Sequence, residues 1–232
     1  MKSLKLASAA AALVLSTSAN STIISYGGYT HDTDTDIVTG NGLEWLQWDR
    51  TTGYSSVSIQ SGLDIIEGGG WSIASNTQMS QLFNAFDFGL TFDNDENTSQ
   101  GLNTGASIGE PGTEADEVFI SMFGDTSDPA IYSSCYYGDC YQRSIAFFGT
   151  DPDGDHRYNL AIVSDDYALV DGSVEHGKVY LNADLYETDM YGYSIAIALV
   201  RDVSTVPVPA AVWLFGSGLI GLVGVARRKV RD

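Results

Sequence analysis

The sequence predicts an α+β domain that is predominantly antiparallel β and contains one short amphipathic helix. Two observations predict this class. Short runs rich in β-branched and aromatic residues recur along the middle of the chain, separated by Gly, Asp and Asn. A single stretch instead repeats its apolar residues with helical spacing. With 232 residues, 44% of them hydrophobic, the chain has material for one sizeable core, which we place within residues 20–203.

The predicted strands are short and widely spaced. The first is 42–48, where apolar and polar side chains alternate in part. Residues 92–116 contain no periodic run, so we expect a long exposed loop there. The other predicted strands are 117–123, 144–149, 158–164, 178–186 and 191–201.

The predicted helix covers residues 76–87. Ser75 and Gln78 have the spacing of a capping box, which marks a helix N-terminus. Four apolar residues follow at positions i, i+3, i+4 and i+7, so one face is apolar, and we expect it to pack in the core rather than bind a cofactor. These residues are Met79, Leu82, Phe83 and Phe86.

Residues 1–19 have the order of a cleaved secretory signal peptide. Lys2 and Lys5 precede an uncharged apolar run, and small residues follow at 16–19. This order is more typical of a signal peptide than of an N-terminal core helix, so the mature chain is expected to begin near Asn20 or Ser21.

The C-terminal segment, residues 204–232, has the composition of a membrane anchor. Residues 206–226 carry no charge, and at ~1.5 Å per residue a helix of that length spans about 30 Å. Aromatic residues lie near the start of the run, and three glycines make one side of the helix narrow. The basic cluster that follows places the C-terminus on the cytoplasmic side and the large domain outside. These residues are Trp213 and Phe215, then Gly218, Gly221 and Gly224, then Arg227, Arg228, Lys229 and Arg231.

A proline pair precedes the apolar run. Pro207 and Pro209 lack amide donors and favour extended conformations in Val206 and Val208, so this strip is expected to be extended at the membrane surface. Proteases bind extended chain. An extended strip, a spanning helix and a basic stop together are the layout of a processing signal for a membrane-embedded transpeptidase.

"VPVPAAVWLFGSGLIGLVGVARRK" resembles the C-terminal sorting signal of exosortase substrates, the PEP-CTERM class, and most closely its VPLPA-CTERM variant. Val208 stands where that variant has Leu, and no Glu lies between the prolines as in the type motif. The resemblance implies an exported protein of a Gram-negative bacterium that is anchored transiently in the inner membrane and cut near the prolines by an exosortase-type enzyme. It would then be delivered to the cell surface or to the extracellular polysaccharide of a biofilm.

A second resemblance lies near the start of the domain. "GLEWLQWDRTTGYSS" followed by "GGGWSIASNTQMSQLF" is similar to a module of unassigned function that recurs in exosortase substrates. Ser72 and Ser75 stand where that module usually has Arg and Thr. The resemblance implies a single domain with a distant likeness to lectin-like folds. Trp45 and Trp71 are expected to anchor the core rather than to form a ligand platform.

The domain is strongly acidic. Residues 20–205 contain 29 Asp and Glu against five Lys and Arg, a net charge of −24. Such a charge excludes nucleic acid as a partner and favours solubility.

The two cysteines, Cys135 and Cys140, are separated by four residues. An exported protein meets an oxidising compartment, so we expect a local disulfide that closes a turn. A zinc site would need further ligands, and the three histidines show no metal-ligand spacing. A catalytic thiol is disfavoured because each cysteine has a partner.

Two segments place carboxylates at alternate positions. "DPDGDH" contains Asp151, Asp153 and Asp155, which could converge on calcium, whereas the alternative is an acidic turn. "HDTDTD", residues 31–36, has the same spacing. Neither matches the EF-hand pattern.

The common catalytic motifs are absent from the sequence, including G-x-S-x-G, H-E-x-x-H and the phosphate loop. We therefore expect a non-catalytic surface or matrix protein. The alternative is a calcium-assisted carbohydrate-binding module on the same sorting tail. A secreted hydrolase is the third hypothesis, since the pair of catalytic carboxylates in a glycosidase has no compact sequence motif.

Overall fold

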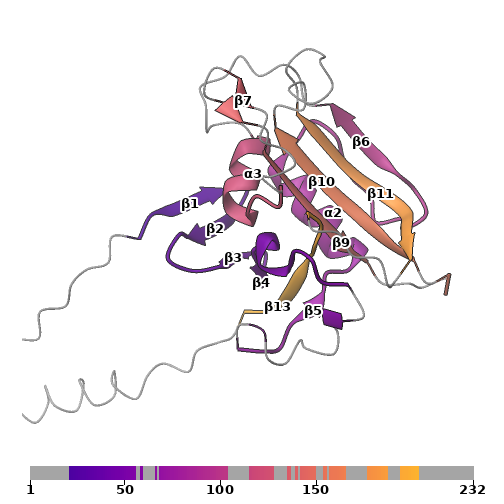
Figure 1. Ribbon diagram of the computed structural model, residues 1–232, viewed down its shortest axis with the longest axis horizontal. Helices are drawn as coiled ribbons and strands as arrows, with labels where there is room; N and C mark the ends of the chain where they lie inside the picture. Colours follow the sequence, from indigo (N-terminus) through magenta and orange to yellow (C-terminus); the bar gives the residue numbers. More distant parts are fainter. Residues whose placement is uncertain are drawn as a thin grey trace, which may run out of the picture.

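The computed structural model describes residues 21–55, 58–59, 66, 68–103, 115–127, 135–136, 139–140, 142–149, 154–155, 157–165, 177–187 and 194–203. These residues form mainly antiparallel sheets together with two α-helices and a 3₁₀ helix (Figure 1). The predicted α+β class is therefore confirmed.

One sheet gathers the two ends of the domain. Four consecutive strands form an antiparallel meander, and the last of them pairs with β13, the final strand, which pairs in turn with β5. The order is β1 (Ile23–Tyr26), β2 (Tyr29–Asp32), β3 (Ile37–Gly40), β4 (Leu43–Leu46), β13 (Leu199–Asp202) and β5 (Ser72–Ile73).

The second sheet is built from the middle of the chain. Its long central strands pair antiparallel, and only the short β12 runs parallel to its neighbour β9. The order is β12 (Ala196–Ile197), β9 (Gln142–Phe148), β10 (Arg157–Asp165), β11 (Lys178–Glu187) and β6 (Gln100–Asn103).

Residues 196–202 belong to both sheets. They form β12 in the second sheet and β13 in the first, with Ala198 between the two strands. The Ala198 amide donates to Phe147 O at 2.9 Å, and its carbonyl accepts from Ala74 N at 2.8 Å. Residues 196–200 are buried. This segment therefore fixes how the two sheets meet.

Both faces of the second sheet are covered, which explains its runs of consecutive buried residues. Ala146 and Phe148 of β9 face a core shared with the helices, whereas Ile145 and Phe147 face a second cluster that contains Trp71. Successive side chains of β9 therefore still point to opposite faces of the sheet, although both faces are apolar.

Helix α2 (Asn76–Phe86) confirms the predicted capping box. The Ser75 hydroxyl accepts from Gln78 N, and the Gln78 side chain accepts from Ser75 N at 2.8 Å. The helix ends at Asp87 in the left-handed conformation. All four residues of the predicted apolar face are fully buried.

Helix α3 (Ala115–Phe123) corrects the strand predicted at 117–123. The apolar run there fits a strand by composition, but Phe119 and Phe123 are four residues apart and both pack into the core, as on one face of a helix. Asp116 and Glu117 in the first turn also favour a helix N-terminus. The domain therefore contains two α-helices within its described part rather than the one predicted.

An aromatic cluster fills the space between α2, α3 and the first sheet. Phe119 lies at its centre, with its ring centroid 4.5 Å from that of Phe123 and 4.9 Å from that of Phe86. Trp48, in the 3₁₀ helix η1 (Trp48–Thr51), packs edge-on against Phe119 at 5.2 Å. Trp45 and Trp71 are buried, as predicted for core anchors.

The remaining strand predictions had mixed outcomes. The strands at 144–149, 158–164 and 178–186 are confirmed as β9, β10 and β11. Within 42–48, β4 gives way to η1, and 191–201 is divided between β12 and β13 where it is described.

Several strands were not predicted, among them β5 and the pair β7 (Cys135–Tyr136) and β8 (Asp139–Cys140). Strands β1, β2 and β3 lie in residues 23–40, and β6 lies inside the expected loop 92–116. The start of that loop is held by Asn84, whose side-chain amide both donates to Phe92 O and accepts from Phe92 N, each at 2.8 Å. This clasp accompanies the burial of Phe92, although residues 93–99 are mostly exposed.

Replacing Phe119 with Ala should destabilise the domain severely, because it leaves a cavity among five aromatic neighbours. We expect a loss of about 3–5 kcal/mol in the free energy of unfolding. Urea denaturation followed by tryptophan fluorescence measures it. Leu90→Ala, at a side chain that is 37% exposed, is the control and should change stability little.

Candidate functional site

The predicted sorting residues follow directly after the last described strand. β13 ends at Asp202, and Val203 N donates to Gly42 O at 3.2 Å. The side chain of Val203 is 38% exposed, so the described domain ends at its surface. The strip Val206–Pro209, the anchor residues Trp213, Phe215, Gly218, Gly221 and Gly224, and the basic residues Arg227, Arg228, Lys229 and Arg231 lie outside the described residues, as does the segment 1–19.

Within the ranges that the structure describes, neither helix is long and apolar enough to cross a membrane.

Arg201 fastens the strand that precedes the tail. Its Nε donates to Glu44 Oε2 at 2.6 Å, directly across the strand pair β13–β4. Its Nη1 donates to Gly69 O at 3.0 Å, and its guanidinium lies 4.2 Å from the centre of the Trp71 ring. Both charged side chains are partly buried, so the pair is screened less than a surface ion pair. Arg201 thereby ties β13 to β4 on one side and to the residues just before β5 on the other.

The cysteines lie opposite one another in a hairpin. β7 (Cys135–Tyr136) pairs antiparallel with β8 (Asp139–Cys140), and the register places Cys135 against Cys140. Opposed residues of an antiparallel pair have Cα atoms about 4.5–5.5 Å apart, within the range that a disulfide spans. The backbone register therefore fits the predicted bond.

Of the predicted calcium ligands, Asp155 alone is described; Asp151 and Asp153 lie outside the described residues. The Asp155 carboxylate accepts from Arg157 N at 2.9 Å and forms an ion pair with its guanidinium at 3.9 Å. In the part of the chain for which placement is given, no three His, Cys, Asp or Glu side chains gather as a metal site.

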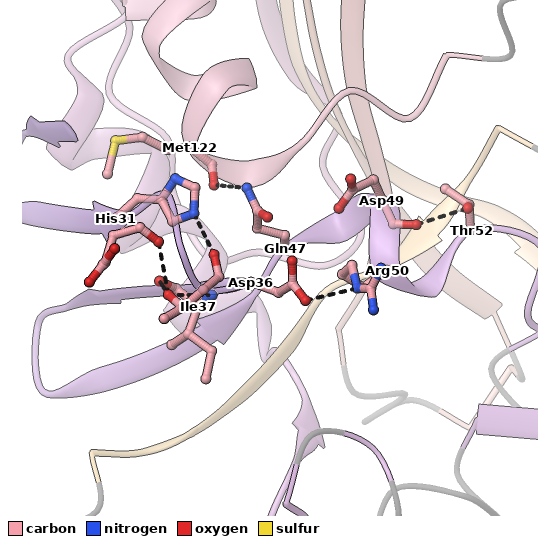
Figure 2. A network of polar contacts seen from close by, with 10 residues as sticks. His31, Asp36, Ile37, Gln47, Asp49, Arg50, Thr52 and Met122 are labelled. Carbon is pink, nitrogen blue, oxygen red and sulfur yellow. Dashed lines mark hydrogen bonds and ion pairs between the residues drawn. The ribbon is translucent and has the colours of Figure 1, made fainter. Parts of the chain in front are cut away.

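The alternating carboxylates of residues 31–36 have separate roles (Figure 2). Asp32 accepts from Asp34 N at 3.0 Å within the turn, and Asp36 forms an ion pair with Arg50 at 3.2 Å. His31 is buried and its Nε2 donates to Thr35 O at 2.9 Å. These contacts hold the β2–β3 turn and connect it to η1.

Asp49 carries a perturbed carboxyl group beside this network (Figure 2). Burial raises the pKa of Asp49, the nearby Asp36 and Asp125 add to the rise, and Arg50 opposes it. Asp49 as a whole is exposed, but its carboxyl group lies against the backbone of Gly124. Gly124 has φ +90°, and a Cβ there would lie 2.6 Å from the Asp49 Cγ. The desolvation is therefore local to the carboxyl group.

Among the described residues, two surface grooves lie at α2. One, about 340 Å³, lies at the helix N-terminus, where Ser75, Asn76 and Thr77 face residues 94–97. The other, about 490 Å³, lies beside the second half of the helix and is bordered by two strand turns. Sequence analysis missed this larger groove because its walls come from three separate segments, which only the strand pairing brings together.

Asp49→Asn should stabilise the domain at neutral pH. A raised folded-state pKa means that ionised Asp49 opposes folding at pH values above that pKa, and the opposition disappears below the unfolded-state pKa of about 4. The melting temperature of the variant should exceed that of wild type at pH 7 and converge with it near pH 3. An equal difference at both pH values would contradict the assignment.

Cys135 and Cys140 should be bonded in protein recovered from an oxidising compartment. Mass spectrometry after alkylation without reduction is expected to find neither cysteine modified, and both modified once the protein is reduced. Two alkylated thiols in the unreduced sample would remove the disulfide.

Comparison with protein-family models, with curated proteins and with solved structures finds no match for this chain. Function is therefore inferred from the residues and their geometry.

Proposed function

We propose that the chain is an exported, non-catalytic surface or matrix protein whose residues 204–232 are a sorting signal for an exosortase-type transpeptidase. The observation that carries the proposal is the order of features after β13: a proline strip, an uncharged run of 21 residues and a basic cluster. Its resemblance to the VPLPA-type signal gives the class of enzyme.

The position of the strip supports this proposal. Two residues separate Val203, which is still hydrogen-bonded to Gly42, from the first residue of the strip, Val206. The contacts of Arg201 that fasten β13 all lie before the strip. A cut near the prolines would therefore release the domain from its anchor without removing any of these contacts.

The charge of the domain is compatible with an extracellular location. A net charge of −24 over residues 20–205 keeps copies of the protein apart and soluble. The same field repels acidic polymers, so a matrix partner is expected to be neutral.

Replacing Pro207 and Pro209 with Ala tests the processing step. Alanine favours helix, so the membrane helix should extend toward the domain and hide the backbone that the enzyme must bind. Uncut protein should accumulate in the inner membrane when the variant is expressed in its native host. Fractionation with an antibody to the domain, together with intact mass, measures this.

The double variant Pro111→Ala, Pro129→Ala is the matched control, since it removes two prolines away from the strip. It should be processed normally. Replacing Arg227, Arg228 and Lys229 with uncharged residues should act differently, by weakening retention of the C-terminus in the cytoplasm. Release of the Pro207 and Pro209 variant at wild-type size would rule out processing at the strip and favour a permanent anchor.

A further inference from the structure

The larger groove is built from three segments that the fold brings together. The β1–β2 turn contributes Gly27 and Gly28, the β3–β4 turn contributes Asn41, and the exposed side of α2 contributes Gln81, Asn84 and Ala85. Its volume, about 490 Å³, is within the range of ligand sites, about 300–1,000 Å³.

The glycine turn is shaped for close contact with the helix. Gly27 and Gly28 have φ of +56° and +84°, as a two-residue hairpin turn with both central residues left-handed requires. A Cβ on Gly27 would lie 2.2 Å from Ala85 O, so only glycine lets the turn meet α2. A Cβ on Gly28 would meet nothing within 4 Å, so the peptide groups of this turn border open space.

Amide groups supply the polar lining. Asn84 donates one N–H to Phe92 O and accepts from Phe92 N, so its amide is held in place by the backbone. Asn41 Nδ2 donates to Gln81 Oε1 at 3.1 Å, which joins the β3–β4 turn to the helix. That bond uses one donor and one acceptor, whereas the two amides together offer four N–H groups and two oxygens, so donors and acceptors remain side by side on exposed side chains.

The groove is uncharged although the domain is strongly acidic. None of the residues that line it carries a formal charge. Tyr29, at the floor, is buried, and burial raises its pKa to about 12, so it stays neutral in any physiological medium. An ion would find no counter-charge here, and a polyanion would be repelled by the domain as a whole.

The shape of the lining also disfavours a peptide. Of the residues that line the groove, only Tyr29 belongs to a strand, and that strand, β2, is paired on both sides, so the lining offers no free strand edge to which a peptide could add. The apolar side chains that border the groove are those of Tyr29, which is buried, and Ala85. Adjacent amide donors and acceptors instead match neighbouring hydroxyl groups, each of which both donates and accepts.

We propose that this groove binds a segment of neutral polysaccharide, with Asn41, Gln81 and the peptide groups around Gly28 as hydrogen-bonding partners. Binding needs no metal ion, which distinguishes this site from calcium-assisted recognition at Asp151–Asp155. The site is independent of the processing of residues 204–232.

Affinity electrophoresis tests the proposal. The full chain, in a zwitterionic detergent without a sugar headgroup, is run through gels that contain dextran, glucomannan or galactan, or alginate as the anionic polymer. We expect at least one neutral polymer to retard the protein, unchanged by EDTA, and alginate to have no effect. Retardation by alginate alone, or by none of the polymers, overturns the proposal, as does retardation that EDTA abolishes.

The double variant Asn41→Gly, Gln81→Ala locates the site. Glycine keeps the left-handed conformation of residue 41, whose φ is +52°, so the turn should survive, and circular dichroism and the melting temperature check this. Loss of several hydrogen bonds should weaken binding about tenfold or more.

Asn97→Ala removes an exposed amide outside the groove and should bind as wild type. A folded double variant that binds as tightly as wild type shows that the groove is not the site. If binding is lost in the double variant but a model peptide such as oligo-alanine competes with the polysaccharide, the ligand class is wrong.

Discussion

Residues 196–202 contribute one strand to each sheet, β12 and β13, and the other strands of both sheets are arranged around this shared segment. β13 pairs with β4 and β5, β12 pairs with β9, and Ala198 bonds to Phe147 of β9 and to Ala74, which follows β5. Because residues 196–200 are buried, each of their backbone groups has to find a partner inside the protein. Its neighbours supply these partners, and in doing so they set the angle and spacing of the two sheets.

The space between the two sheets determines which side chains the helices contribute to the core. α2 and α3 fill it with phenylalanines, and the edge-on contacts around Phe119 pack rings from both helices against Trp48. Polar residues near this core hydrogen-bond to the backbone of neighbouring elements and hold them in place. Gln47 Nε2 donates to Met122 O at 2.9 Å (Figure 2). Asn84 in turn holds Phe92, so side-chain amides join loops to helices at the border of the apolar core.

Local patterns allowed part of this fold to be predicted. The capping box and apolar face of α2 are encoded within twelve residues, and the long strands β9, β10 and β11 contain runs of aliphatic and aromatic residues. α3 was missed because its apolar run is short and contains a single polar position, Ser121, which is too few to reveal a helical period. β1 to β3 were missed because threonine, aspartate and glycine interrupt their alternation, and pairing rather than composition makes them strands. The amide groove was beyond sequence analysis for a related reason, since Asn41 and Gln81 are forty residues apart and meet only through the fold.

The place of residues 196–202 at the end of the domain has a consequence for how the protein is made. β4 must wait for a partner about 155 residues further along the chain, so many of the contacts are non-local and the domain is expected to fold slowly. A ribosome adds about 5–20 residues per second, so the nascent domain stays open for several seconds or longer, with the inner edge of β4 unpaired. If residues 204–232 act as the proposed sorting signal, the sheet is completed only when the proposed anchor segment is being made. Folding and anchoring would then take place in the same interval.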